Sequence, residues 1–224
     1  MTCIRSFAVR ALAVGLALAS SCARAEGTTI AAAVTDMKGK PVADAVVVAI
    51  PADGASKPAA KSREATIDQI DLEFVPRVLA ISVGTPVTFP NHDRVRHHVY
   101  SFSPAKRFEL PLYSGMPAQA VVFDQPGVVV LGCNIHDWMI SYVYVSESPY
   151  YAKTGPDGRA TINELPSRAY VVRVWHPELE GPEEGTRRNV DTSRSARADV
   201  AWQVDLRPEM KVRRAPAAGR GSRY

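Results

Sequence analysis

Apolar and polar side chains alternate with a period of two residues along much of the chain. The clearest case is near the C-terminal end, where polar or small residues separate Val200, Trp202, Val204 and Leu206. Alternation of this kind is typical of a β-strand that buries one face. After residue 25 no stretch shows the apolar stripe of a helix, so the pattern predicts an all-β protein.

Shorter apolar runs bounded by turn residues predict further strands. Residues 28–34 and 42–50 are β-prone and flank the turn-forming residues 36–41, which predicts a hairpin. Residues 128–131 and 142–145 are valine- and tyrosine-rich and predict two more strands. The polar stretch 181–197 is expected to be a loop, and Lys106 and Arg107 are expected in another loop before Phe108.

The N-terminus has the pattern of a secretory signal peptide. Arg5 and Arg10 flank the first region, residues 11–19 are apolar, and Ala23-Arg24-Ala25 offers a cleavage site before Glu26. The apolar region is too short to span a bilayer, which predicts a soluble mature chain without a transmembrane segment. The periplasm is the expected destination, and a lipoprotein anchored at Cys22 is the alternative.

The net charge of +4 is unevenly distributed. The signal segment holds three arginines and no acids, and residues 207–224 form a basic tail that we expect to be disordered. The body between them, residues 26–206, therefore sums to −4. This distribution argues against a nucleic-acid partner, because the positive charge is a tail and not a patch with aromatic residues.

Cleavage of the signal would remove Cys3 and Cys22 and leave Cys133 as the one thiol. An intramolecular disulfide then cannot form. In an oxidising compartment an unpaired cysteine is a liability unless it is buried or occupied by a metal. The cysteine content therefore favours a metal site at Cys133.

The sequence GCNIHDWMI, residues 132–140, places a thiol, an imidazole and a thioether at intervals of three residues. Cys133, His136 and Met139 converge if the backbone forms a tight loop between the strands predicted at 128–131 and 142–145. A thiolate and imidazoles with a weak axial thioether suit a blue-copper electron-transfer site. Such a site needs a second histidine.

The segment VTFPNHDRVRHHV, residues 87–99, resembles plastocyanin and amicyanin, which are cupredoxins. In that pattern a strand ends in an asparagine, followed six residues on by the first histidine ligand and then by a valine two beyond. The match places Asn91, His97 and Val99 at these positions, and the spacing of GCNIHDWM is that of amicyanin's loop. The resemblance covers residues 66–146 and implies a Greek-key β-sandwich that binds one type 1 copper ion.

The flanking sequence resembles a second kind of module. VTDMKGKPVADAVVVAI is similar to the first half of a carboxypeptidase-regulatory-like, or transthyretin-like, β-sandwich, and residues 153–175 are similar to its second half. The resemblance therefore implies a cupredoxin domain inserted in a smaller β-sandwich. The expected segments are a signal peptide (1–25), the split sandwich (26–60 and 148–206), the cupredoxin domain (61–147) and the tail (207–224).

The resemblance implies the metal ligands His97, Cys133, His136 and Met139. His98 competes with His97, since neighbouring side chains of a strand point to opposite faces; the register with Asn91 and Val99 favours His97. Asn91 is expected to hold the ligand loop and tune the thiolate by hydrogen bonding, the alternative being an ordinary turn residue.

Three residues depart from the pattern: Arg96 stands where the family has a proline, and Asp137-Trp138 stands where amicyanin has Pro-Phe. Arg96, Asp137 and Trp138 are predicted to form a docking face for a redox partner protein, with Trp138 as its apolar contact. The alternative is that Trp138 packs beneath the loop.

These residues predict a periplasmic electron carrier and not an enzyme, because the chain has too few histidines for a trinuclear copper cluster. The alternative is a copper protein for storage or delivery. A third hypothesis, adhesion or carbohydrate binding by the split sandwich, would require a degenerate copper site, whereas the ligand residues are intact.

Overall fold

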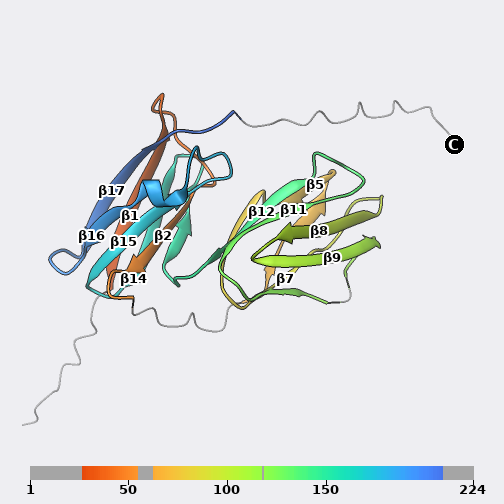
Figure 1. Ribbon diagram of the computed structural model, residues 1–224, viewed down its shortest axis with the longest axis horizontal. Helices are drawn as coiled ribbons and strands as arrows, with labels where there is room; N and C mark the ends of the chain where they lie inside the picture. The colour runs from red at the N-terminus through yellow and green to blue at the C-terminus, as the bar shows by residue number, and fades with distance from the viewer. Residues whose placement is uncertain (1–26, 55–62, 118, 209–224) are drawn as a thin grey trace, which may run out of the picture.

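The computed structural model describes residues 27–54, 63–117 and 119–208 of the chain (Figure 1). The signal-peptide prediction, Cys3, Cys22 and nearly all of the predicted tail lie outside these residues. Within them the protein is all-β, with one short 3₁₀-helix, η1 (Glu183–Thr186). No helix of the described part is long and apolar enough to cross a membrane.

Strands from both ends of the described chain build one sandwich, which we call the split sandwich. A three-stranded sheet in the order β14-β1-β17 faces a four-stranded sheet in the order β13-β2-β15-β16. The strands are β1 (Thr28–Asp36), β2 (Val46–Pro51), β13 (Tyr151–Lys153), β14 (Arg159–Leu165), β15 (Ala169–Trp175), β16 (Arg188–Asp191) and β17 (Arg197–Val204).

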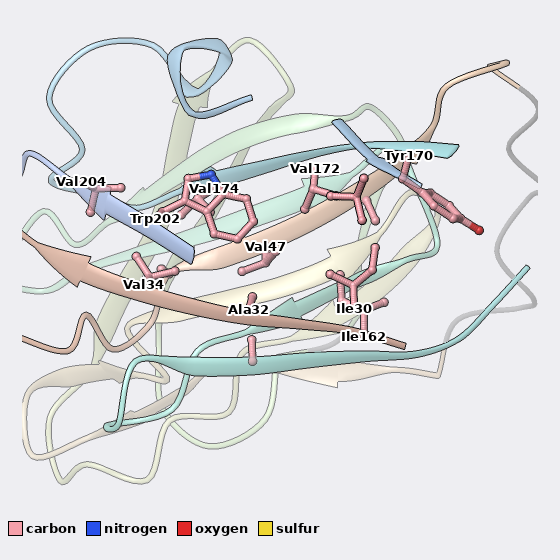
Figure 2. Close-up of a cluster of buried hydrophobic side chains, with 14 of the residues drawn as sticks. Ile30, Ala32, Val34, Val47, Ile162, Tyr170, Val172, Val174, Trp202 and Val204 are labelled. Carbon is pink, nitrogen blue, oxygen red and sulfur yellow. The ribbon is translucent and has the colours of Figure 1, made fainter. Parts of the chain in front are cut away.

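The core of the split sandwich lies between its two sheets and is built mainly of apolar side chains (Figure 2). Alternate residues of β1 point into it, namely Ile30, Ala32 and Val34, as the pleat of a strand requires. Trp202 of β17 is the largest side chain here and donates its indole N–H to the carbonyl oxygen of Thr186, 2.6 Å away.

Strands between residues 65 and 146 build the second sandwich, which we call the inserted sandwich. Its sheets have the orders β10-β7-β3 and β6-β12-β11-β8-β9, and β4 and β5 form a separate hairpin. The strands are β3 (Ala65–Thr66), β4 (Asp68–Ile70), β5 (Glu73–Val75), β6 (Val78–Ser82), β7 (Thr85–Thr88), β8 (His97–Ser103), β9 (Lys106–Tyr113), β10 (Val121–Phe123), β11 (Gly127–Gly132) and β12 (Ile140–Ser146).

The chain leaves the split sandwich after β2 and returns at β13, and these two strands pair antiparallel, with Tyr151 opposite Val48. The insertion therefore begins and ends at neighbouring strands. That the two sandwiches are separate domains with the boundaries given above stays a prediction.

An apolar cluster joins the two sandwiches. Val46 and Val48 of β2 are fully buried in it together with Tyr144 of β12, and the rings of Tyr144 and Trp175 lie 5.5 Å apart. Val47 and Ala49 point the other way, into the core of the split sandwich. This double coverage explains why the run Val46-Val47-Val48-Ala49 shows no polar alternation.

Three expectations from the sequence are wrong. Strands β1 and β2 do not form a hairpin, because each pairs with other strands in opposite sheets and the chain crosses the core between them. The stretch 181–197 is not a loop throughout, since it contains η1 and β16, whose Thr186 and Val190 are buried. Lys106 and Arg107 begin strand β9, where Lys106 forms an ion pair with Asp124.

Candidate metal centre

Three side chains of the inserted sandwich converge at one end of its core. The Sγ of Cys133 lies 4.0 Å from Nδ1 of His97 and 3.9 Å from Nδ1 of His136. All three ligand atoms lie within 4.8 Å of one another, a group that fits a metal ion. One sulfur and two nitrogen donors thus meet, although His97 and Cys133 are 36 residues apart in the sequence.

The loop between β11 and β12 supplies two of these three side chains. The strands pair up to their ends, where Gly132 lies opposite Ile140, so residues 133–139 must close a tight loop. The backbone N–H of Met139 donates to the carbonyl oxygen of His136 at 2.9 Å and forms a turn within this loop. The close spacing of Cys133 and His136 follows from this geometry.

Gly132, just before Cys133, leaves room for the end of the Tyr100 side chain. A Cβ at this position would lie 2.8 Å from atoms of the Tyr100 ring, which covers the strand from β8. Real Cβ atoms do not approach other atoms so closely. A glycine therefore lets the Tyr100 ring rest against the backbone next to Cys133.

The two histidine rings have different surroundings. His97 is completely buried, and its Nε2 lies 2.7 Å from Oδ2 of Asp93. Because a carboxylate only accepts hydrogen bonds, Nε2 is the nitrogen that donates to Asp93, and the tautomer with its proton on Nε2 has the lone pair of Nδ1 facing Cys133. For His136, burial and the neighbouring His97 lower the pKa of the imidazole, which favours the neutral, ligating form.

Met139 is buried in the same apolar cluster as Cys133. The cluster places its thioether in the interior of the inserted sandwich, beneath the ligand loop. That its sulfur joins the other three donors as a fourth ligand stays a prediction.

The structure places His97, and not His98, beside Cys133. A bulge interrupts the pairing of β8 with β9 between His97 and Val99, and His98 lies within it. The Nε2 of His98 lies 2.8 Å from Oε1 of Glu109, so its ring turns toward β9.

Asn91 holds the segment that leads to His97. Its amide nitrogen donates to the carbonyl oxygens of Val95 and Tyr113, at 3.0 and 2.8 Å, and its carbonyl oxygen accepts the N–H of Asp93 at 2.9 Å. These bonds hold the segment between Asn91 and His97 against the strand that contains Tyr113. The expected influence of Asn91 on the thiolate stays a prediction.

The predicted docking residues differ in exposure. Arg96 and Asp137 are exposed, and His136 is partly exposed. Trp138 is partly buried: its indole N–H donates to the carbonyl oxygen of Leu72 at 3.1 Å, and its ring centre lies 5.1 Å from that of His136. Trp138 therefore packs against the protein, as the alternative interpretation expects, and its role in docking stays a prediction.

Asp93 is the residue of this site that the sequence analysis missed. It lies four residues before His97, in the loop and outside any helix, so no regular spacing relates the two side chains. The signal that was available is chemical: histidines that bind metals usually donate their other N–H to a carboxylate or carbonyl oxygen.

Comparison with known proteins gives partial matches. A copper-containing nitrite reductase from Thermus scotoductus SA-01 is 28% identical over 38% of this chain (TM-score 0.35). The match covers only 22% of the reductase chain. A purple cupredoxin from Nitrosopumilus maritimus is 30% identical over 37% of this chain and 99% of its own (TM-score 0.33). A reduced mutant of amicyanin is 20% identical over 46% of this chain and 99% of its own (TM-score 0.33). No protein-family model matches, and a search of curated proteins finds no match.

Proposed function

We propose that this protein is a periplasmic copper protein that carries single electrons between redox partners. The observation that supports the proposal is the convergence of Cys133 Sγ with the Nδ1 atoms of His97 and His136. Thiolate and imidazole donors together suit copper. The proposed ligands are His97, Cys133, His136 and the axial thioether of Met139, around one type 1 ion.

The donor set fits copper better than it fits the other common metals. Zinc at a structural site takes four strong ligands, whereas three strong donors with a buried methionine are typical of a blue-copper centre. Copper would supply the one-electron couple Cu(II)/Cu(I). The protein would bind it through Sγ and two Nδ1 atoms, keep water away by burial, and limit movement of the ligands through the loop and strand contacts described above.

Storage or delivery of copper is the alternative function. A delivery site exchanges its metal readily and therefore needs exposed ligands. Cys133 is 3% exposed and His97 is 0% exposed, so burial supports the electron carrier. Rapid removal of copper by a mild chelator would favour delivery, whereas slow removal with strong blue colour favours electron transfer.

The test is to add Cu(II) to the purified mature protein and record visible and electron paramagnetic resonance spectra. We expect an intense blue species with one copper per chain, absent in Cys133→Ala. His98→Gln is the matched control, because His98 is also a buried histidine of β8 but turns away from Cys133, and it should keep the colour. A colourless protein, or a colour lost equally in both variants, would reject the proposal.

We further propose that redox partners dock over His136. Its partial exposure supports this, as do the neighbouring Ile135, which is 49% exposed, and the exposed charges of Arg96 and Asp137. Reversing the charge of Arg96 should change the salt dependence of electron exchange without changing the copper spectrum. An unchanged salt dependence would argue against docking at this face.

A further inference from the structure

The turn between β4 and β5 touches both histidine-bearing segments of the site. Asp71 and Leu72 form this two-residue turn, and both have positive φ, +54° and +62°. Positive φ at both central residues is the pattern of a type I′ hairpin, which normally uses asparagine, aspartate or glycine. Leucine at such a position is uncommon, and a strained turn persists only where its surroundings hold it in place.

Asp93 holds the turn from the His97 side. Its Oδ1 accepts the N–H of Asp71 at 2.8 Å, and its Oδ2 accepts the N–H of Leu72 at 3.0 Å. The same Oδ2 lies 2.7 Å from Nε2 of His97. The carboxylate of Asp93 therefore connects the strained turn with the fully buried imidazole of His97, and the Asp93 side chain is itself only 12% exposed.

Trp138 holds the turn from the His136 side. Its indole N–H donates to the carbonyl oxygen of Leu72 at 3.1 Å, and its ring packs against that of His136. The N–H of Leu72 therefore binds Asp93, which contacts His97, and the C=O of Leu72 binds Trp138, which packs against His136. Leu72 thus connects Asp93 with Trp138.

We propose that Leu72, Asp93 and Trp138 form a clamp that fixes the orientation of both histidine rings before a metal binds. The clamp extends the proposed function, because it identifies the residues that position the ligands. It rests on that function only in assuming that both histidines bind copper. Asp93 and Trp138 are positioning residues, because each acts on the centre through a histidine.

Asp93→Asn should break the clamp. Three N–H donors point at the two oxygens of Asp93, whereas an asparagine has one acceptor oxygen and an NH₂ group that must face a donor in either orientation. At least one of the three bonds is therefore lost. Asp68→Asn is the matched control: it lies on the same hairpin and contacts the exposed His92, which is not part of the site.

The first measurement needs no copper. In the metal-free protein, hydrogen exchange followed by NMR should show a protected Leu72 amide and a protected Trp138 indole N–H. Asp93→Asn should speed the exchange of both by about tenfold, although Asp93 does not touch Trp138. Asp68→Asn should leave them unchanged. Equal exchange in the two variants would overturn the clamp even in a protein that binds copper.

The second measurement tests coupling at the copper centre. Asp93→Asn should release Cu(II) to a chelator about 10- to 100-fold faster, as is usual when the support of a metal-bound histidine is lost, and should raise the reduction potential because a negative charge beside His97 is gone. Trp138→Phe keeps an aromatic ring at this position but removes the indole N–H, and should also speed release. The double variant should be less than additive, because both changes free the same turn. Full additivity would mean two independent supports and no clamp.

Discussion

The two sandwiches of this chain fill their interiors with different chemistry. The core of the split sandwich consists of aliphatic side chains and the aromatic rings of Tyr170 and Trp202. The inserted sandwich also has an apolar core, but at one end it buries Cys133 and Met139, next to the completely buried His97. Buried polar groups of the split sandwich include the Thr154 hydroxyl and the Trp202 indole, which donate to backbone carbonyl oxygens. In the inserted sandwich a buried imidazole and a buried amide must also be satisfied by hydrogen bonds.

This difference appears in the hydrogen bonds around each core. In the inserted sandwich, the fully buried Gln69 donates to the carbonyl oxygens of Phe89 and Pro90, and Asn91 bridges three backbone groups. These bonds surround the strand and loop that lead to His97. The inserted sandwich therefore uses side-chain hydrogen bonds to hold the candidate site. We expect the split sandwich and the inserted sandwich to respond differently to mutation.

The largest effect on stability is expected in the split sandwich. Trp202→Ala removes a large side chain that is 3% exposed and should lower the free energy of unfolding by about 3–5 kcal/mol. The copper spectrum of the folded variant should stay unchanged, because Trp202 lies in a separate core. Denaturant unfolding and visible spectroscopy of the same sample check both statements. An altered spectrum would show that the two cores are not independent.

A smaller effect is expected at the junction. Trp175→Ala removes the ring that contacts Tyr142 and Tyr144 of β12 and should cost about 2 kcal/mol. Because the junction couples the two sandwiches, we expect the variant to unfold in two transitions where the wild-type protein unfolds in one. A single transition in the variant, at an unchanged midpoint, would contradict a coupling role for Trp175.

A still smaller effect on stability is expected at the site itself. Met139→Leu nearly conserves volume and should change the free energy of unfolding of the metal-free protein by less than about 1.5 kcal/mol. The copper spectrum should nevertheless change, because the proposed axial thioether is lost. Ile81→Leu, in the same apolar cluster, is the control and should leave the spectrum as it is. Equal spectra in both variants would remove Met139 from the ligand set.

The smallest effect concerns pH. Burial raises the pKa of Glu183 above its usual 4.5, so the folded state binds its proton more tightly than the unfolded chain does. The stability from this group is present below pH 4.5 and is lost as pH rises through the folded pKa. Glu183→Gln removes this loss, so the variant should gain stability relative to the wild-type protein as pH rises above 4.5.

Glu184 provides a control of opposite sign. The hydrogen bond from Arg173 lowers the pKa of Glu184, so its contribution to stability is present above pH 4.5 and is lost as pH falls through the folded pKa. Glu184→Gln should therefore lose stability relative to the wild-type protein as pH rises. Thermal unfolding between pH 3 and 8, roughly the range in which carboxylates and histidines titrate, compares the two variants. The same slope in both would contradict the assignment for Glu183.

Local patterns predicted several strands well. The runs at 128–131 and 142–145 lie in β11 and β12, and the alternation before Leu206 lies largely in β17. Pairing was harder to predict. The segments 28–34 and 42–50 have the residues of a hairpin, but tertiary packing places β2 between two apolar clusters, in the sheet opposite β1. Strand β16 was missed because its one buried residue, Val190, stands among charged neighbours.

The candidate site shows the same limit. The spacing of Cys133 and His136 within one loop is visible in the sequence, and a resemblance pointed to His97. The supports of the rings are not visible there, because Leu72 bonds to Asp93 and to Trp138 across 21 and 66 residues of sequence. Such contacts arise only when segments distant in sequence are folded together.

Copper X-ray absorption of the loaded protein tests the central claim most directly, since it identifies the atoms bound to the ion. One short copper–sulfur bond and two imidazole nitrogens are predicted, with the sulfur bond absent in Cys133→Ala. A copper ion surrounded only by nitrogen and oxygen atoms would contradict the assignment of Cys133 as a ligand, and with it the electron-carrier function.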